Sequence, residues 1–245
     1  MQNTIHCRSN LLLGEDVMQR MAQCRVLVVG VGGVGSWCAE SLVRTGIQHL
    51  TIVDSDVVDV TNINRQLMAT TLTVGMPKVE VLKERLLQIN PQADIEAVRG
   101  RYSDEVYQDF HLDSYDYIVD AVDSLKDKVS LILRACDTQA VFFSSMGAAL
   151  KVNPTGVSVA EFWKVQGCPL AATLRRRFKH LKQFPSRKFQ CVYDPNVEEN
   201  RGEPLYNADG HPINGSLVHI TGIFGMTLSG LIINDIYSKT KNQKS

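Results

Sequence analysis

The sequence contains no closely paired cysteines. None of its cysteines forms a C-x-x-C pair, and they are scattered along the chain, at Cys7, Cys24, Cys38, Cys136, Cys168 and Cys191. This spacing argues against a disulfide framework and against a four-thiolate zinc site. Several of the cysteines fall in expected core elements, where a buried free thiol is ordinary. Cys168 can also be read as a thioester or persulfide carrier, although Pro169 after it favours a helix start.

The sequence has no excess of charge of either sign. Lys plus Arg and Asp plus Glu number 26 each in 245 residues, so bulk charge indicates no class of partner. The N-terminus has no long apolar run of the secretory type, and we expect a cytoplasmic protein.

Residues 212–234 carry no formal charge over 23 positions, which is enough to span a bilayer. Their glycines, hydroxyls and His219 favour a buried core helix, and we expect no stable membrane span.

Strand-like and helix-like segments alternate through the first 145 residues. Short β-branched or aromatic runs predict strands at Val26–Val29, Leu50–Val53, Ile95–Val98, Tyr117–Val119 and Val141–Ser144. Helical spacing of apolar residues predicts helices at Gly35–Thr45, Lys78–Gln88 and Lys126–Cys136. The alternation predicts an α/β fold: a Rossmann-like, doubly wound, mostly parallel sheet with helices on both faces.

The pattern changes after about residue 150. We expect a strand at Thr155–Ala160 and a helix at Pro169–Leu181, with proline in its first turn. Residues 194–214 are rich in Pro, Gly, Asn and acidic groups and predict a mobile loop. The apolar segment then predicts a second helix, so the C-terminal extension carries one basic helix and one apolar helix.

A glycine-rich loop, "GVGGVG", joins the first predicted strand to the first predicted helix. It obeys G-x-G-x-x-G in the context that nucleotide binding requires. Gly30 and Gly32 allow a tight turn and close approach of phosphate, Gly33 adds room beside them, and Gly35 lets the helix pack on the strand. Asp54 ends the second strand, where a carboxylate binds ribose hydroxyls. These features serve NAD and ATP equally well, so the loop alone does not choose between them.

The residues after Asp54 favour a triphosphate. The stretch "NINRQ" crowds Asn62, Asn64, Arg65 and Gln66 together, and Lys78 begins the next helix. Arginine presents a fork of donors that matches phosphate oxygens, and amides hold phosphate or metal-bound water. A dehydrogenase has no general need of this set. For any one of these residues, the alternative is a solvated polar loop.

Two carboxylates, Asp120 and Asp123, follow the fourth predicted strand. Ligands bind at the carboxyl ends of parallel strands, and Mg²⁺ usually takes one or two protein carboxylates beside phosphate. Asp123 lies further along the loop and is the stronger candidate for the metal. Asp120 is equally suited to capping the turn that follows.

Residues 175–188 form a basic segment in which seven Lys or Arg occur with no acidic residue. Phe178, His180 and Phe184 lie between the cations, and the rest of the chain is net acidic. This distribution favours binding to a nucleic-acid backbone over a solvated helix face of mixed charge. The predicted RNA-binding residues are Arg175, Arg176, Arg177, Lys179, Lys182, Arg187 and Lys188.

The order of the motifs resembles that of the E1-like adenylating superfamily over roughly residues 8–135. The motifs are, in turn, G-x-G-G-x-G, an Asp-ended strand, N-x-N-R-Q, G-x-P-K and D-x-x-D. The superfamily's bacterial members activate carboxylates as acyl-adenylates. The resemblance implies that ATP and Mg²⁺ are bound by Gly32, Asp54, Asp56, Asn64, Arg65, Lys78 and Asp123. The opening "CRSNLLLGED" is similar to the family's N-terminal arm, whose arginine, here Arg8, reaches the neighbouring subunit's ATP. This implies a homodimer.

Residues 149–179 and 189–194 are similar to the branch of this superfamily that dehydrates threonylcarbamoyladenosine in tRNA. That resemblance implies adenylation of the threonyl carboxylate, then ring closure that expels AMP. It assigns residues 1–150 to ATP binding and residues 151–245 to tRNA binding and dimer packing, continuous with the same sheet. The stretch "SSMGAAL" departs from the branch's more glycine-rich sequence and puts the substrate in question.

Two other functions remain open from the residues. One is adenylation of the C-terminus of a ubiquitin-like sulfur-carrier protein, although the paired C-x-x-C ligands common in that branch are absent. The other is an NAD-binding oxidoreductase or sensor module. The resemblance also leaves open a monovalent cation and a sulfur-acceptor or cysteine desulfurase partner.

Overall fold

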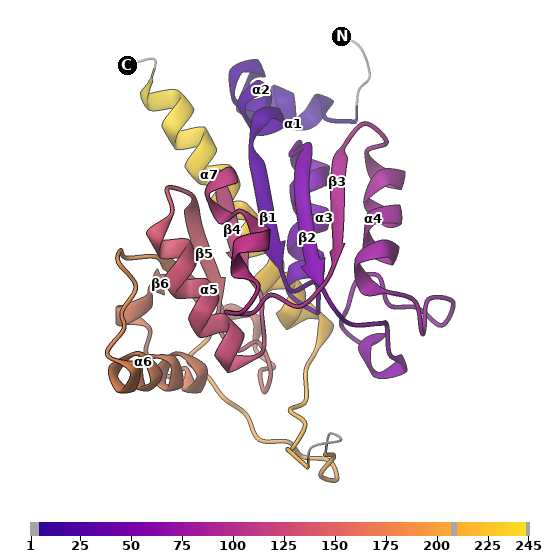
Figure 1. The fold of residues 1–245 in the computed structure, drawn as a ribbon. Helices are drawn as coiled ribbons and strands as arrows, with labels where there is room; N and C mark the ends of the chain where they lie inside the picture. The colour runs from indigo at the N-terminus through magenta and orange to yellow at the C-terminus, as the bar shows by residue number, and fades with distance from the viewer. Residues whose placement is uncertain (1–4, 207–209, 244–245) are drawn as a thin grey trace.

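The computed structural model describes residues 5–206 and 210–243. Within them, seven strands form a single sheet in the order β3-β2-β1-β4-β5-β7-β6 (Figure 1). The strands are β1 (Arg25–Val29), β2 (His49–Asp54), β3 (Asp94–Arg99), β4 (Tyr117–Asp120), β5 (Val141–Ser145), β6 (Ser158–Glu161) and β7 (Gln190–Tyr193). All neighbours pair in parallel except β6, which runs antiparallel to β7. The predicted Rossmann-like sheet is confirmed.

Two apolar cores cover the two faces of the sheet. In β1, Val26 and Val28 join one cluster while Leu27 and Val29 join the other, because successive side chains of a strand point to opposite faces. Figure 1 shows α5 and α6 in front of the sheet, and α3, α4 and α7 behind it. The α-helices are α1 (Cys7–Leu13), α2 (Glu15–Gln23), α3 (Gly35–Thr45), α4 (Lys78–Ile89), α5 (Leu125–Asp137), α6 (Pro169–Leu181) and α7 (Val218–Asn242).

Most predicted elements match the structure to within a residue or two at each end, and α3 and α6 match exactly. The predicted strand at Thr155–Ala160 is wrong in its first half. A short 3-10 turn, η4 (Pro154–Gly156), precedes β6, and the Asn153 side chain accepts a hydrogen bond from the Thr155 backbone N–H at 3.0 Å. Proline fixes φ near its helical value, and the asparagine side chain stabilises the turn, so the strand starts later.

The remaining short elements lie in connecting segments. They are η1 (Val60–Asn62), η2 (Tyr107–Phe110), η3 (Leu112–Ser114) and η5 (Phe162–Lys164). The predicted loop at residues 194–214 contains no helix or strand within its described part, apart from one bridge between Tyr206 and Pro212. Residues 207–209 of that segment lie outside the described residues.

Helix α7 is the long apolar helix that the sequence predicts. It is long and apolar enough to cross a membrane, but half of its most apolar window is buried inside the molecule. Its inner stripe, spaced four residues apart, is fully buried in the core against α3 and the sheet, and consists of Ile220, Phe224, Leu228, Ile232 and Ile236. The first turn of α7 reaches the carboxyl ends of the strands, where it contributes to the site described below.

Candidate functional site

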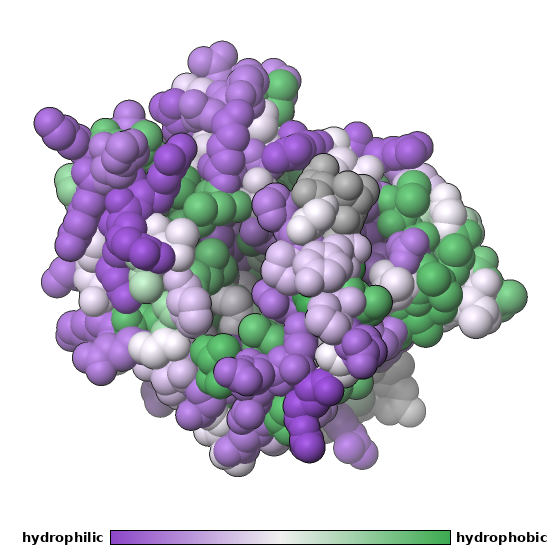
Figure 2. Space-filling model, turned by 90° about the horizontal axis from the view of Figure 1, so that it is seen from below, coloured by the Kyte–Doolittle hydropathy of each residue, from purple (hydrophilic) through white to green (hydrophobic). Residues whose placement is uncertain are grey.

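A cleft of about 720 Å³ opens at the carboxyl ends of the parallel strands. Figure 2 views the molecule from this end and shows a face hollowed near its centre. Most of the predicted nucleotide-binding residues line this cleft, although they come from five separate segments of the chain. They are Gly30, Gly32, Gly33, Asp54, Asp56, Arg65, Gln66, Lys78 and Asp123.

The glycine loop requires glycine at its first and last positions. Gly30 has φ +86°, and a Cβ there would lie 2.6 Å from the Ala121 carbonyl oxygen. A Cβ on Gly35 would lie 1.8 Å from the Gly30 carbonyl oxygen, so only glycine lets α3 begin this close to β1. The turn leaves the N-terminal end of α3 beside the cleft, and helix N-termini carry partial positive charge that favours phosphate.

Asp54 ties the glycine loop to the loop that follows β2. One oxygen, Oδ2, accepts a hydrogen bond from the Val31 backbone N–H, and Oδ1 accepts one from the Asp56 backbone N–H, both at 2.9 Å. The carboxylate therefore fixes the shape of both loops. Each oxygen keeps a further lone pair that can accept a ribose hydroxyl.

The cations of the cleft are held by local partners. Lys78 Nζ lies 2.7 Å from Asp56 Oδ2, and the lysine side chain is 7 % exposed while that of Asp56 is 63 % exposed. Arg65 Nη1 donates to the Thr61 carbonyl at 2.9 Å and to Asn64 Oδ1 at 3.0 Å. Because Arg65 lines the cleft and its other donors are not committed to these bonds, it can bind an anion there.

Gln66 presents an unpaired acceptor to the cleft. Its side-chain oxygen, Oε1, is buried at the cleft and has no hydrogen-bond partner within the described residues. Buried polar atoms in proteins are nearly always paired, so an unpaired amide oxygen in a cleft wall is well placed to meet a ligand donor.

Four predicted site residues do not line the cleft. Asn62 is buried, and its side chain closes a capping box with Asp59 at the start of η1. The Asn64 amide donates to the Ser216 carbonyl at 2.9 Å and so joins its loop to the segment before α7. Gly35 acts through packing, as described above. Arg8 is exposed on α1, and α1 lies at the opposite end of the sheet from the cleft (Figure 1).

A buried ion pair that sequence reasoning missed fixes the loop that carries Asp123. Lys128 Nζ lies 2.8 Å from Asp120 Oδ2, and both side chains are fully buried. The lysine also donates to the Val122 carbonyl at 2.9 Å, and Ser144 Oγ donates to Asp120 at 2.6 Å. Asp120 is thus occupied inside the protein. The available sequence signal was a lysine eight residues after an aspartate that ends a buried strand.

Asp123 is the exposed carboxylate of this loop. Its side chain has no hydrogen-bond partner among the described residues, and it lines the cleft together with Asp56. The described residues contain no cluster of three or more His, Cys, Asp or Glu that would form a closed metal site. One or two carboxylates facing a phosphate site are the donor set that Mg²⁺ uses, so the residues present fit that ion.

The far wall of the cleft contains residues that the sequence did not single out. Arg101 Nε lies 2.7 Å from Asp127 Oδ2, and both residues line the cleft beside Tyr102. Asp127 is buried in the first turn of α5, and hydrogen bonding to its carboxylate raises the pKa of Arg101 above its ordinary value. No motif marks this pair, because its members are 26 residues apart and meet only in the folded chain.

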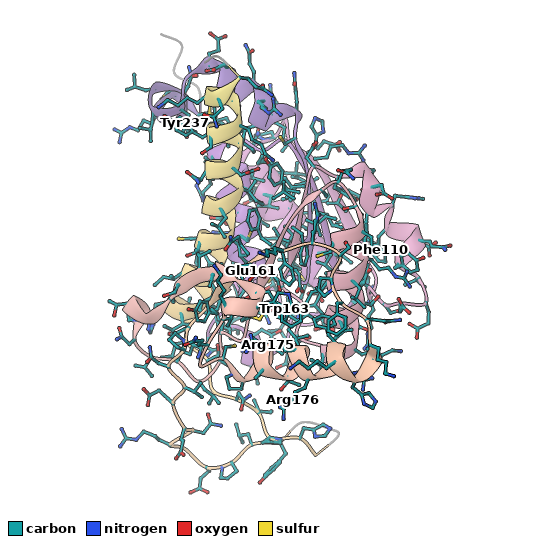
Figure 3. The ribbon with its side chains drawn as sticks, turned by 90° about the vertical axis from the view of Figure 1, so that its left-hand side faces the viewer. Phe110, Glu161, Trp163, Arg175, Arg176 and Tyr237 are labelled. Atoms are coloured by element: carbon teal, nitrogen blue, oxygen red, sulfur yellow. The ribbon has the colours of Figure 1, made fainter. Side chains whose placement is uncertain are left out.

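The basic segment divides into inward and outward cations. The Arg175 guanidinium donates to the carbonyls of Phe162 and Val165 at 3.1 and 2.9 Å, and Arg187 donates to the carbonyls of Ala135 and Ala140. Figure 3 shows Arg175 on the side of α6 that faces Trp163, and Arg176 on the outer side. The RNA-binding prediction therefore depends on the five exposed cations, Arg176, Arg177, Lys179, Lys182 and Lys188.

Comparison with known proteins identifies the family. The ThiF family model matches residues 6–237, which is nearly the whole chain. The chain belongs to the ThiF family. In this ThiF protein, the glycine loop, Asp54, Arg65, Lys78 and Asp123 meet at one cleft, as the resemblance to adenylating enzymes implies.

The relatives are similar over almost their full length. The chain is 38 % identical over 230 residues to a Bacillus subtilis protein named tRNA threonylcarbamoyladenosine dehydratase, covering 92 % of this chain and 90 % of the relative. It is 39 % identical over 237 residues to the Haemophilus influenzae protein of the same name, covering 91 % and 90 %. A crystal structure of Escherichia coli tRNA N6-threonylcarbamoyladenosine dehydratase in complex with ATP superimposes with a TM-score of 0.87. That structure is 31 % identical, and the match covers 97 % of this chain and 96 % of that one.

Proposed function

We propose that this ThiF protein is an ATP-dependent enzyme that dehydrates N6-threonylcarbamoyladenosine in tRNA to its cyclic form. The observation that carries the proposal is the convergence of the glycine loop, Asp54, Arg65, Lys78 and Asp123 on one cleft. The relatives that bear this name at 38 and 39 % identity support the substrate. The solved E. coli relative in complex with ATP supports the nucleotide.

The reaction divides into two displacements. The threonyl carboxylate attacks the α-phosphate of ATP, forming a new O–P bond and releasing pyrophosphate. A nucleophile of the same modified base then attacks the activated carbonyl, closing the ring, releasing AMP and losing its proton to solvent. No cysteine nucleophile is needed, because the substrate itself resolves the adenylate. The thiol of Cys168 is only 3 % exposed at the N-terminus of α6 and lies outside the cleft lining.

The chain's own residues position the nucleotide and stabilise charge. The glycine loop and the start of α3 cradle phosphate, and Asp54 accepts hydrogen bonds from the ribose. Lys78 and Arg65 lie along the cleft wall, where their charge offsets the charge that develops on the α-phosphate. Such preorganised cations supply much of the catalysis in phosphoryl transfer. To reach a phosphate, the Lys78 ammonium group has to weaken or break its ion pair with Asp56. The Asp56 side chain is exposed, so its carboxylate can then turn toward a bound metal ion.

Mg²⁺ completes the proposed site. Asp123, together with Asp56 on the lining of the same cleft, would hold the ion against the phosphates. When bound, Mg²⁺ neutralises phosphate charge and helps pyrophosphate to leave.

We further propose that the protein works as a homodimer in the cytoplasm. Arg8 lies at the opposite end of the molecule from the cleft, so it can act on ATP only in a partner's site (Figure 1). Exposed leucines next to it, Leu11 and Leu12, are 79 and 81 % exposed and suit a subunit contact. A monovalent cation and a sulfur-acceptor or cysteine desulfurase partner stay predictions of the family resemblance.

The exposed cations of α6 support tRNA as the substrate. Figure 2 shows hydrophilic side chains gathered on the side of the molecule where α6 lies, next to the hollowed face. Contacts to phosphates steepen the salt dependence of binding by roughly 0.7–0.9 log units per contact. Three of the five exposed cations, Arg176, Arg177 and Lys179, lie on α6, and Lys182 and Lys188 follow it in the chain.

The direct test is chemical. Purified protein is incubated with Mg-ATP and tRNA that carries the modified adenosine, and the nucleosides are analysed by mass spectrometry. The proposal predicts that the modified adenosine loses the mass of one water and that AMP accumulates in equal amount. An unchanged nucleoside, with AMP formed instead on a sulfur-carrier protein that ends in Gly-Gly, would assign the chain to the other branch. Tight binding of NAD without binding of ATP in calorimetry would exclude adenylation.

A further inference from the structure

A second groove, of about 500 Å³, runs between α5 and α6. Its floor is apolar, formed by Val129 and Leu133 of α5 and by Leu181 of α6, while charged side chains stand at its rim. Ligand-binding hollows in proteins are typically 300–1,000 Å³, so its size suits one small planar group with an attached charge. The adenylation site does not use this groove.

Phe184 lines this groove and is 53 % exposed. Its ring centroid lies 6.2 Å from that of Trp163, which is itself 38 % exposed. Figure 3 shows Trp163 just above α6, at the edge of the basic segment. An exposed aromatic ring within a run of cations, with a second exposed ring beside it, is a combination with which proteins bind unpaired bases, because every base offers a π-face.

The charges around Phe184 favour a polyanion. Arg177 lines the groove and forms no ion pair within the described residues, and Lys182 and Lys188 are exposed on either side of Phe184 in the sequence. Among the acidic residues of the groove, Asp104 is already paired with Arg134 at 3.2 Å. Only Asp137, at the C-terminal end of α5, leaves a carboxylate at the rim.

The groove and the cleft are lined by neighbouring residues of the same segments. Lys126 lines the groove while Asp127, the next residue of α5, lines the cleft. Along the preceding segment, Tyr102 lines the cleft and Asp104 lines the groove. An RNA chain that places one nucleotide in the cleft can therefore place a neighbouring nucleotide in the groove.

We infer that the α5–α6 groove binds an unpaired nucleotide of the RNA substrate, next in the chain to the adenosine that enters the cleft. The base stacks on Phe184, and its phosphate lies against Arg177. This inference rests on the proposed function, since it assumes an RNA substrate. Bringing the modified adenosine into the cleft separates it from its stacked neighbour, and stacking that neighbour on Phe184 offsets part of the cost.

The test compares three variants: Phe184→Ala, Phe184→Tyr and, as a control, Leu205→Ala. Leu205 is 67 % exposed but lies outside both hollows. Loss of one stacked base should raise the KM for modified tRNA by about 5- to 100-fold in Phe184→Ala, with kcat and the KM for ATP unchanged. Phe184→Tyr should restore the KM, and Leu205→Ala should match the wild type. A KM for tRNA in Phe184→Ala within twofold of the control would overturn the inference.

A binding measurement separates this inference from the proposed function. A stem–loop RNA with an unpaired loop should quench tryptophan emission of the wild type, because Trp163 adjoins Phe184. The quench should be largely lost in Trp163→Phe, which keeps Trp37 as its remaining tryptophan. If the wild type forms no AMP with modified tRNA but the quench occurs as described, the proposed function fails and the groove is still an RNA site. Equal quenching in both proteins would show that RNA does not bind the groove.

Discussion

Lys128 and Asp120 form an ion pair in which neither side chain is exposed, with Lys128 Nζ 2.8 Å from Asp120 Oδ2. The same lysine binds the Val122 carbonyl, so one buried charge holds both ends of the turn that leads to Asp123. The exposed carboxylate of Asp123 is thus positioned from inside the protein.

Removal of Lys128 should strongly destabilise the fold. In Lys128→Met, Asp120 keeps hydrogen bonds from Ser144 and the Val122 backbone N–H but loses its countercharge. An uncompensated buried charge costs about 3–5 kcal/mol, and urea unfolding at pH 7 measures it. The exposed pair of Lys126 and Glu105, 2.7 Å apart, is the control, since solvent screens that pair and Lys126→Met should leave the stability close to that of the wild type. Equal losses in the two variants would contradict the role of the buried pair.

Lys78 should matter for catalysis far more than for stability. Its partner Asp56 is 63 % exposed, so Lys78→Ala leaves no buried charge behind. Loss of one preorganised cation lowers the rate of AMP formation by about 10²–10³-fold. Lys83→Ala, on the same helix but outside the cleft, is the matched control and should keep the wild-type rate. Similar rates for the two variants would remove Lys78 from the site.

The stability of the core should depend on pH through Glu40. Burial alone would raise the pKa of Glu40, but hydrogen bonds from Arg85 and Arg44 outweigh it and hold the pKa below its ordinary value of 4.5. A carboxyl whose pKa is lowered by folding contributes stability above its unfolded pKa and loses it as pH falls through the folded value. Glu40→Gln should therefore cost about 1–3 kcal/mol at pH 7, with the difference from wild type shrinking below pH 4. Urea unfolding of both proteins at pH 7 and below pH 4 tests this. A difference in the free energy of unfolding that stays constant between the two conditions would contradict it.

Two inactive variants should restore activity when mixed, if Arg8 acts across a dimer. Arg8→Ala removes the arginine that serves the partner's site, and Asp123→Ala disables its own site. A mixed dimer has one site with both an intact Asp123 and an intact Arg8 from its partner. After the two proteins are unfolded and refolded together, AMP formation should recover to a clear fraction of the wild type. No recovery, with dimers present, would mean that Arg8 does not act in the partner's site.

The parallel sheet from β1 to β5 and its helices could be predicted from the sequence, because these strands are short apolar runs and α3, α4 and α5 show a helical period. The N-terminal helices α1 and α2 and strand β7 were not predicted. The error before β6 arose where Asn153 and Pro154 override the strand preference of Thr155 and Val157. Local turn chemistry decides such positions, and hydrophobic pattern alone does not reveal it.

The candidate site could be predicted only where its residues belong to motifs. The glycine loop, Asp54 and Lys78 have fixed spacing and reach the cleft as expected. Arg101 and Asp127 meet there only through folding and leave no local signal. Arg175 was predicted to bind RNA because it belongs to a basic run, but its guanidinium turns inward and donates to carbonyl oxygens. Charge in a sequence predicts a basic surface and not which cations face solvent.

The central claim is that a tRNA carboxylate attacks ATP in this cleft, and exchange of labelled pyrophosphate into ATP tests it most directly. We expect exchange that requires tRNA carrying threonylcarbamoyladenosine, does not occur with unmodified tRNA, and falls at least about 10²-fold in Lys78→Ala. Exchange that a Gly-Gly-ended protein supports and modified tRNA does not would contradict the account.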